Sequence, residues 1–262
     1  MNSKIALIGF GEAASTFAKA AMWGSRACAW DIAGARRAAM VACGVTPGES
    51  ARLALEGAQL VLSLVTADQA VAAARDYAGF LAPGAIWCDM NSVAPNTKRE
   101  AAEAIAAAGA LYVDVAVLAP VEPARLAVPL LLAGGAAAAA EAALRNSGFE
   151  NLRIVGDETG KASAIKMVRS VMVKGIEALT DEMMQAAEAA GVVDDVLTSL
   201  DASEKVMPWH SRAAYNLERM QRHGVRRAAE MEESAKTLLG LGIEPVMTLG
   251  TAKRQRQAGQ ER

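Results

Sequence analysis

The segment Lys4–Ala14, KIALIGFGEAA, constrains the fold of this chain more than any other segment. A short apolar run is followed directly by a G-x-G-x-x-A pattern, Gly9 to Ala14, and a helical pattern begins at once. In such a loop the first glycine permits a tight turn, the second lets the backbone approach a pyrophosphate, and the small third residue lets the helix pack against the strand. The helix start offers unpaired N–H groups to an anion. The pattern therefore predicts a dinucleotide-binding strand–loop–helix unit.

A carboxylate at the end of the second expected strand supports this prediction. Asp31 ends the strand Ala27–Asp31, about twenty residues after the loop, as the dinucleotide fingerprint requires. Such a carboxylate accepts hydrogen bonds from the adenosine ribose and repels a 2′-phosphate, so NAD is favoured over NADP. Arg36 and Arg37 leave NADP possible, because either side chain could reach a 2′-phosphate; a solvated helix face is the simpler interpretation.

Strand and helix patterns alternate through the first part of the chain, which predicts a parallel, doubly wound α/β sheet with helices on both faces. The expected strands cover residues 5–9, 27–31, 60–64, 85–89, 112–117, 129–133 and 152–155. The expected helices cover residues 12–22, 34–42, 50–56, 69–80, 97–108 and 136–146. Such sheets bind ligands outside the carboxyl ends of their strands, where one cleft is expected. The residues expected to converge there are Asp31, Val65, Thr66, Asn91, Ser92, Leu118 and Ala119.

After Gly156 the pattern is helical throughout. Residues 162–190 contain no proline and only one glycine, which predicts one long helix whose apolar stripe is buried between other elements. The stripe consists of Ile165, Val168, Met172, Ile176, Leu179 and Met183. Further helices are expected at 194–204, 211–221 and 225–239, before a polar, frayed tail at 253–262. The chain is thus expected to form a Rossmann domain, residues 1–158, and an all-helical domain, residues 159–262.

Composition argues against several classes of protein. The net charge of −2 provides no field that would recruit nucleic acid or an acidic membrane. The apolar stretch Leu126–Leu144 is interrupted by a proline and a glycine pair, and no membrane span is expected. No signal peptide is expected, because the first strand begins almost at the first residue. Three scattered cysteines match no metal-ligand spacing, so we expect no metal and reduced thiols in a cytoplasmic protein.

With these motifs the chain resembles the β-hydroxyacid dehydrogenase superfamily, which includes 3-hydroxyisobutyrate and 6-phosphogluconate dehydrogenases. Besides the dinucleotide loop, the resemblance rests on Asp89–Pro95 (family pattern D-x-S/N-x-x-x-P), on Asp114–Val117 and on Gly160–Lys166. It implies a Rossmann domain, a long linking helix and an all-helical substrate domain that often forms homodimers. It also implies an NAD(P)-dependent oxidoreductase that acts on a small hydroxy acid or related alcohol.

The chain departs from the superfamily at two places. Leu118 stands near the position of a serine that contacts the substrate oxyanion, and Arg169 and Ser170 replace two substrate-binding asparagines. Together with residues 223–231, HGVRRAAEM, these departures resemble a bacterial branch whose short C-terminal domain has no assigned function. The resemblance therefore implies the reaction class without naming a substrate.

Lys166 is the general acid/base at the carbinol oxygen that the resemblance implies. A free lysine, with a pKa of about 10.4, is a poor base at neutral pH. Burial in an apolar helical environment is expected to lower that pKa. The alternative is an ordinary solvated lysine. Arg169, on the same helix face, is a candidate receptor for a substrate carboxylate or phosphate, or else an ion-pair partner of Glu177 or of another acidic residue.

Other candidate residues have a structural alternative. Asn91 and Ser92 are expected to hold the nicotinamide ribose and the substrate carboxylate, or to cap the helix that follows. Thr66 is expected to contact the cofactor at the end of its strand; the alternative is that it caps the next helix. Trp209 and His210 are expected to line the substrate pocket; the alternative is a packed tryptophan and a histidine near a helix cap.

The expected cofactor-binding residues are Gly9, Phe10, Gly11, Glu12, Ala13, Ala14, Asp31, Val65, Thr66 and Asn91. The expected substrate-binding residues are Ser92, Leu118, Arg169, Ser170, Trp209 and His210.

Two other functions are alternatives to the dehydrogenase. An imine reductase would reduce a C=N bond, although those relatives usually lack the lysine. A non-catalytic dinucleotide sensor would explain the missing asparagines.

Overall fold

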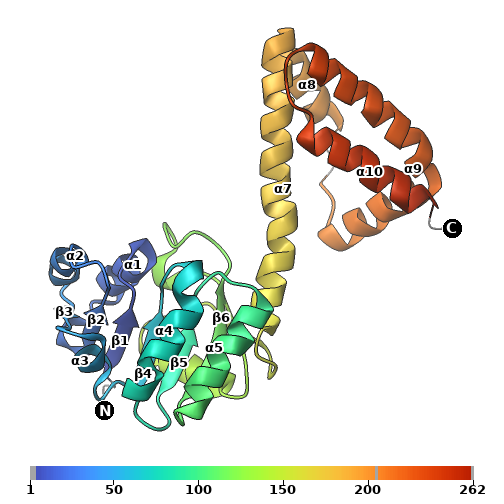
Figure 1. Ribbon diagram of the computed structural model, residues 1–262. Coiled ribbons are helices and arrows are strands. Elements are labelled where there is room, and N and C mark those ends of the chain that lie inside the picture. The colour runs from blue at the N-terminus through green and yellow to red at the C-terminus, as the bar shows by residue number, and fades with distance from the viewer. Residues whose placement is uncertain (1–3, 204–205, 261–262) are drawn as a thin grey trace. The chain divides into compact units, whose positions relative to one another are not determined.

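The computed structural model describes residues 4–203 and 206–260 (Figure 1). The chain divides into two compact units, Met1–Arg169 and Ser170–Arg262. The long helix α7 (Lys161–Ala190) belongs to both units, because the division falls within it. The domain boundary expected from the sequence, after residue 158, lies just before this helix.

The first unit is built on one sheet with the strand order β3-β2-β1-β4-β5-β6-β7-β8. The strands are β1 (Ile5–Ile8), β2 (Ala27–Trp30), β3 (Thr46–Pro47), β4 (Leu60–Ser63), β5 (Ile86–Asp89), β6 (Leu111–Val117), β7 (Leu130–Ala133) and β8 (Leu152–Gly156). The strand order reverses beside β1, so the sheet is doubly wound, and its switch point lies between β1 and β4. The predicted fold class is confirmed.

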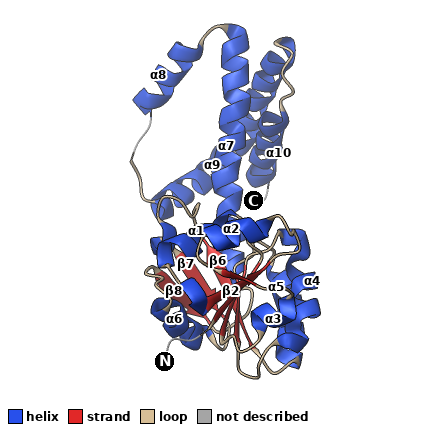
Figure 2. Cartoon of the chain, turned by 90° about the vertical axis from the view of Figure 1, so that its left-hand side faces the viewer, coloured by secondary structure: helices blue, strands red, loops and turns tan. Residues whose placement is uncertain are grey.

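Helices cover both faces of this sheet (Figure 2). They are α1 (Glu12–Ala21), α2 (Arg36–Ala42), α3 (Ala51–Leu55), α4 (Ala70–Tyr77), α5 (Pro95–Ala107) and α6 (Ala137–Asn146). Short 3₁₀ turns η1 (Gly24–Arg26), η2 (Ala67–Gln69), η3 (Ala78–Phe80) and η4 (Arg125–Ala127) join some of them. Along β1, Ile5 and Leu7 enter one apolar core and Ala6 and Ile8 enter the other, as the alternation of a strand requires.

Strand β7 corrects the prediction of an all-parallel sheet. It runs antiparallel to β6, with Val117 opposite Leu130, and parallel to β8. The connection from β6 to β7 contains only the turn η4, whereas a parallel return would need a crossover, usually a helix. The two-residue edge strand β3 was also absent from the predicted elements.

The helical unit differs from the prediction in two of its elements. Besides the later part of α7 it contains α8 (Val193–Ser203), α9 (Trp209–Gly240) and α10 (Val246–Gln260). The helices expected at 211–221 and 225–239 are one continuous helix, α9. The tail expected to be frayed is the ordered helix α10, because residues such as Ala252 are buried against the rest of the unit. Residues 261–262 of that tail lie outside the described residues.

The apolar stripe of α7 is another correction. Its residues were expected to be buried, yet Val168 is 73% exposed and Met172 and Ile176 are each 48% exposed. Burial of α7 by the helical unit begins at Glu182. Within the described part of a single chain, the middle of α7 is therefore an uncovered apolar surface.

Glu182 fastens α7 to the first turn of α10. One carboxylate oxygen accepts from the backbone N–H of Met247 at 2.7 Å, and the other accepts from the N–H and hydroxyl of Thr248 at 2.8 and 2.6 Å. Burial alone would raise the pKa of Glu182, but these hydrogen bonds outweigh burial, and the pKa is lowered. The ionised carboxylate therefore satisfies N–H groups that the helix itself leaves unpaired.

Replacing Glu182 by glutamine is expected to destabilise the helical unit by about 1–2 kcal/mol at neutral pH. A lowered native pKa contributes stability above the unfolded-state pKa, and this stability is lost as the pH falls through the native pKa. The difference between wild type and Glu182→Gln should therefore shrink as the pH falls through the lowered native pKa of Glu182. Urea unfolding followed by circular dichroism at neutral pH and at a series of acidic pH values tests this, with the exposed Glu188→Gln as the matched control. A loss of stability that is equal at every pH would contradict it.

Candidate cofactor and active site

The loop between β1 and α1 packs closely on the backbone after β4 at Gly9 and is open to a ligand at Gly11. Gly9 has φ +86°, and a Cβ there would lie 2.5 Å from the carbonyl oxygen of Leu64, so only glycine fits. A Cβ on Gly11 would meet nothing within 4 Å, so the start of α1 faces open space. No side chain caps this end of α1 in the described structure. The fully buried Ala14 lies where the helix packs on the sheet.

Asp31 is held at the end of β2 by two backbone donors. Its Oδ2 accepts from the N–H of Phe10 at 2.7 Å, and its Oδ1 accepts from the N–H of Ala33 at 2.8 Å. The side chain of Phe10 is buried in the core, so this residue contributes through its backbone. Because a carboxylate has about four acceptor sites, Asp31 can still accept from a ribose hydroxyl.

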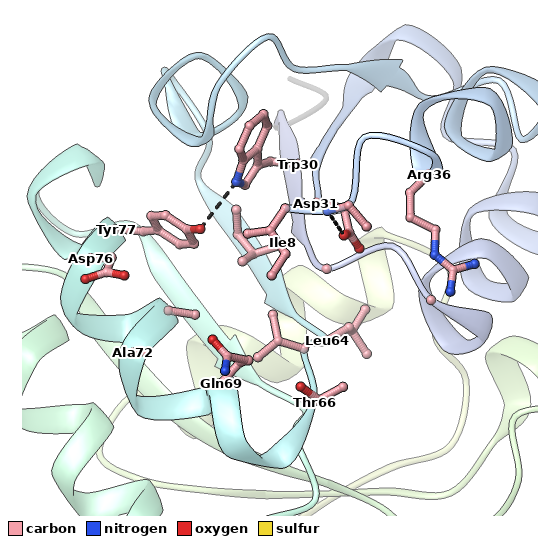
Figure 3. A pocket seen from close by; sticks show the side chains of 16 residues that line it. Ile8, Trp30, Asp31, Arg36, Leu64, Thr66, Gln69, Ala72, Asp76 and Tyr77 are labelled. Carbon is pink, nitrogen blue, oxygen red and sulfur yellow. Dashed lines mark hydrogen bonds between the residues drawn. The ribbon is translucent and has the colours of Figure 1, made fainter.

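A cavity of about 410 Å³ adjoins this carboxylate. Trp30, Asp31 and Arg36 line it on one side and Thr66 and Tyr77 on the other (Figure 3). The indole N–H of Trp30 donates to the hydroxyl of Tyr77 at 3.3 Å. Val65 also lines the cavity.

Two of the alternatives weighed from the sequence can be compared with this geometry. Arg37 donates to the carbonyl of Gly48 at 2.8 Å and is absent from the cavity lining, whereas Arg36 lines the cavity. The side chain of Thr66 does not cap the turn η2 that follows it.

The loop after β5, residues 90–94, forms a second polar corner at the same edge of the sheet. Asn91 donates from its backbone N–H to Asp89 at 2.9 Å and from its side chain to the hydroxyl of Ser63 at 3.0 Å. The Oδ1 atom of Asn91 is buried and has no hydrogen-bond partner among the described residues. Helix α5 begins at Pro95 without a side-chain cap. Asn91 and Ser92 therefore do not cap this helix.

Lys166 meets this loop from α7. Its Nζ donates to the hydroxyl of Ser92, and its side chain is half-buried rather than enclosed in apolar surroundings. Further along the same helix, Arg169 donates to the carbonyl of Leu118 at 3.2 Å, at the end of β6. The first unit thus joins an amine, a hydroxyl and a guanidinium to the carboxyl edge of its sheet.

The remaining candidate residues belong to the second unit. Trp209 is 57% exposed, with the guanidinium of Arg212 lying 5.6 Å from its ring centroid, so it is not a packed core tryptophan. His210 is exposed beside it at the start of α9, and Ser170 is half-buried on α7. A substrate-binding role for these three residues stays a prediction.

A buried ionic cluster beneath the loop was missed by the sequence analysis. It consists of Lys98, Asp89, Asp114 and Tyr112, all of them buried. Burial raises the pKa of Asp114, and burial beside Asp89 raises the pKa of Tyr112 above its usual range. The sequence did contain a signal that Lys98 is buried, because Lys98 shares a helix face with Ala101 and Ile105, and this is the buried face of α5.

The residues present fit a dinucleotide. Open space over the helix start at Gly11, a carboxylate at Asp31 and an unsatisfied buried amide oxygen at Asn91 provide groups for the pyrophosphate, the ribose and the nicotinamide end. The described residues contain no group of three potential metal ligands. None of the described helices combines the length and hydropathy that a membrane crossing requires.

The fold and this site define a dinucleotide-binding Rossmann protein. Residues 4–146 match the family described as the NAD binding domain of 6-phosphogluconate dehydrogenase, and residues 187–258 match a domain of unknown function (DUF1932). The chain belongs to the 6-phosphogluconate dehydrogenase-like NAD-binding family, and its first unit binds NAD. The predicted resemblance and cofactor are confirmed.

Solved structures agree with this assignment. A conserved hypothetical protein from Sinorhizobium meliloti 1021 is 37% identical, covers 100% of this chain and 91% of its own, and has a TM-score of 0.65. The conserved protein MTH1747, described as similar in structure to 3-hydroxyacid dehydrogenases, is 29% identical over 97% and 96% of the two chains, with a TM-score of 0.63. An imine reductase from Myxococcus stipitatus, in complex with NADP⁺, is 18% identical over 97% and 93%, with a TM-score of 0.80. The last likeness concerns the fold alone.

Proposed function

We propose that this protein is an NAD-dependent oxidoreductase that transfers a hydride between the nicotinamide and a small hydroxy acid or related alcohol. Lys166 is its general acid/base. The observation that carries this proposal is the hydrogen bond from Lys166 to Ser92, which joins α7 to the loop at the carboxyl edge of the sheet. Ligands of doubly wound sheets bind at that edge.

Each polar group of the site then has a role in the reaction. The loop from Gly9 to Ala14 holds the pyrophosphate, and Asp31 holds the adenosine ribose. When bound, the nicotinamide supplies the hydride acceptor. The neutral amine of Lys166 takes the hydroxyl proton as the hydride leaves the substrate carbon, and Ser92 orients that amine. In the reverse direction the ammonium of Lys166 returns the proton to the carbonyl oxygen.

Arg169 makes a small anionic substrate the best fit. Its guanidinium is exposed beside the carbonyl of Leu118, one helical turn from Lys166. A planar guanidinium binds a carboxylate or phosphate through two parallel hydrogen bonds, which fixes the orientation of the substrate.

The proposed partner is a small-molecule substrate, and we propose no binding of nucleic acid or membranes. The three free cysteines support a cytoplasmic location.

NAD is proposed as the preferred cofactor because of Asp31. Replacing Asp31 by asparagine removes the charge that repels a 2′-phosphate, so we expect the ratio of NADP⁺ to NAD⁺ affinity to rise by about tenfold or more. Titration of both cofactors, followed by protein fluorescence, measures this ratio. The matched control is Arg37→Ala, since Arg37 binds Gly48 and does not line the cavity. An unchanged ratio in Asp31→Asn would contradict the assignment.

A homodimer is the second part of the proposal. Val171 is 76% exposed and Ile176 is 48% exposed on α7 of a single chain, and covering such apolar surface is favourable by about 25 cal/mol per Å². Sedimentation equilibrium should give twice the mass of one chain, and Val171→Glu should shift the equilibrium toward the monomer. A monomeric wild type at micromolar concentration would exclude the dimer.

Imine reduction is the alternative, and the likeness in fold to the Myxococcus stipitatus imine reductase favours it. The two reactions differ in the proton that must move. An iminium ion already carries its proton on nitrogen when the hydride arrives at carbon, whereas an alcohol must lose its hydroxyl proton to a base as the hydride leaves. The lysine at position 166 therefore favours the alcohol.

The deciding experiment measures the near-ultraviolet absorbance of NADH in two panels. One panel offers NAD⁺ with small hydroxy acids and alcohols, and the other offers NADH with cyclic imines. Turnover in the first panel alone supports the proposed function. Turnover in the second panel alone replaces it with imine reduction. Tight NADH binding without turnover in either panel favours a non-catalytic sensor.

A further inference from the structure

A buried ammonium lies beneath the proposed active-site loop. Lys98, which is 0% exposed, places its Nζ 2.9 Å from Oδ1 of Asp89, 2.6 Å from the backbone carbonyl oxygen of the same residue and 3.5 Å from Oδ1 of Asp114. The two carboxylates come from directly paired positions of β5 and β6. The hydroxyl of Tyr112 donates to the other oxygen of Asp89 at 2.7 Å.

Each carboxylate also holds one part of the proposed active site. Asp89 accepts from the N–H of Asn91 at 2.9 Å, which fixes the start of the loop 90–94. Asp114 accepts at 2.9 Å from the N–H of Ser163, in the first turn of α7. The hydroxyl of Ser163 in turn donates to the carbonyl of Val93 in the loop. The cluster therefore links the two segments that carry Ser92 and Lys166.

The ammonium of Lys98 offsets part of the cost of burying two adjacent carboxylates. Burial raises the pKa of Asp114, and the positive charge of Lys98 opposes that rise. Without the ammonium, two adjacent buried carboxylates would repel each other and one would take a proton. A protonated Asp114 is a weaker acceptor for the N–H at the start of α7.

We infer that Lys98 is a positioning residue, which holds the loop 90–94 and the first turn of α7 together so that Ser92 meets Lys166. The inference rests on the proposed function, since the pair it positions is the proposed acid/base and its orienting hydroxyl. Lys98 lies too deep to touch a substrate. A stable apolar packing would hold the sheet equally well, whereas a cluster with directed hydrogen bonds fixes one geometry.

The test compares three variants. Lys98→Met removes the ammonium, and Lys98→Met with Asp114→Asn also removes one carboxylate and thereby restores the net charge of the cluster. Ile105→Ala, equally buried on the same helix, destabilises the unit without touching the cluster. For each variant we would measure kcat, KM, NADH affinity, thermal stability and amide hydrogen exchange.

Lys98→Met should lower kcat by about 100-fold, because misplacing catalytic groups by 1 Å costs about this much. NADH affinity should fall by much less than kcat, because among the proposed cofactor-binding residues only Asn91 lies in the loop 90–94. Amide exchange should accelerate at least about tenfold in residues 90–94 and 161–166 and stay unchanged in residues 9–14. The double variant should regain thermal stability but not kcat. Ile105→Ala should keep its kcat per folded molecule.

Two results would overturn the inference. One is a kcat in Lys98→Met within about threefold of wild type; the other is a double variant that regains kcat together with stability, which is the behaviour of a purely structural residue. Failure of the proposed function looks different, because the wild type itself would then lack turnover. In that case hydrogen exchange decides: unchanged protection of the two segments in Lys98→Met overturns the positioning role, and local loss of protection supports it.

Discussion

Replacing Lys166 by alanine is expected to lower kcat by about 100- to 10,000-fold while NADH affinity changes little. The amine of Lys166 is the group that the proposed reaction needs to remove the hydroxyl proton, and the dinucleotide loop lies elsewhere, between β1 and α1. Initial rates with the best hydroxy acid measure the loss, and NADH fluorescence measures cofactor affinity. Lys166 is proposed to act on the hydroxyl proton of the substrate and not on the cofactor. Lys166→Ala should therefore lower kcat without a comparable loss of NADH affinity.

Two further variants show whether the chemistry of the amine is responsible. Lys166→Arg keeps the positive charge but cannot lose a proton, so it should be nearly as inactive as Lys166→Ala. Lys174→Ala removes an exposed lysine further along the same helix and should retain full turnover. Turnover that survives in Lys166→Ala would remove this residue from the chemistry and would strengthen the imine reductase alternative.

Replacing Gly224 by valine is expected to destabilise the helical unit by about 3 kcal/mol or more. A Cβ on Gly224 would lie 2.1 Å from the carbonyl oxygen of Gln255 and 3.0 Å from the backbone nitrogen of Gly259. Both atoms are backbone atoms of α10, so a rotamer change cannot relieve the clash, and α9 and α10 must separate. Urea unfolding of the full chain, followed by circular dichroism, measures the loss.

Gly175 offers the matched control, because it also lies within a long helix. A Cβ there would meet nothing within 4 Å, so Gly175→Ala should stabilise the protein by about 0.5–1 kcal/mol through helix propensity alone. Gly224→Ala should instead lower stability, despite the same gain in propensity. If Gly224→Ala were as stable as the wild type, the close approach of α9 and α10 would not be a requirement of the fold.

The same glycine explains one limit of the sequence analysis. The sequence predicts two helices, at 211–221 and 225–239, and Gly224 lies in the gap between them. In the structure Gly224 is buried within α9, and its missing side chain serves contact with another helix. Helix propensity counts only the destabilising effect of a glycine within a helix. The close packing that Gly224 allows involves α10, about thirty residues further along the chain, so no local sequence pattern reveals it.

The Rossmann unit was more predictable because its signals are local. Gly9, Gly11 and Asp31 each meet a requirement set within one strand–helix–strand unit. These requirements are the tight turn at Gly9, the open space over Gly11 and the carboxylate of Asp31 beside the loop. Lys98 was missed for the opposite reason. Its partners come from two other strands, and a lysine is assigned by default to a solvated face.

The division of the chain within α7 has an evolutionary consequence. Ser92, Lys166, Leu118 and Arg169 all precede Ser170, so both hydrogen-bonded pairs of the proposed site are encoded by the first 169 residues. A gene fusion that joined the chain just before α7 would carry over the proposed dinucleotide site without Lys166. Recombination after Arg169 would transmit both together. Under the proposed function, the sequence beyond that point can therefore diverge, and select new substrates, while the proposed proton-transfer pair is kept.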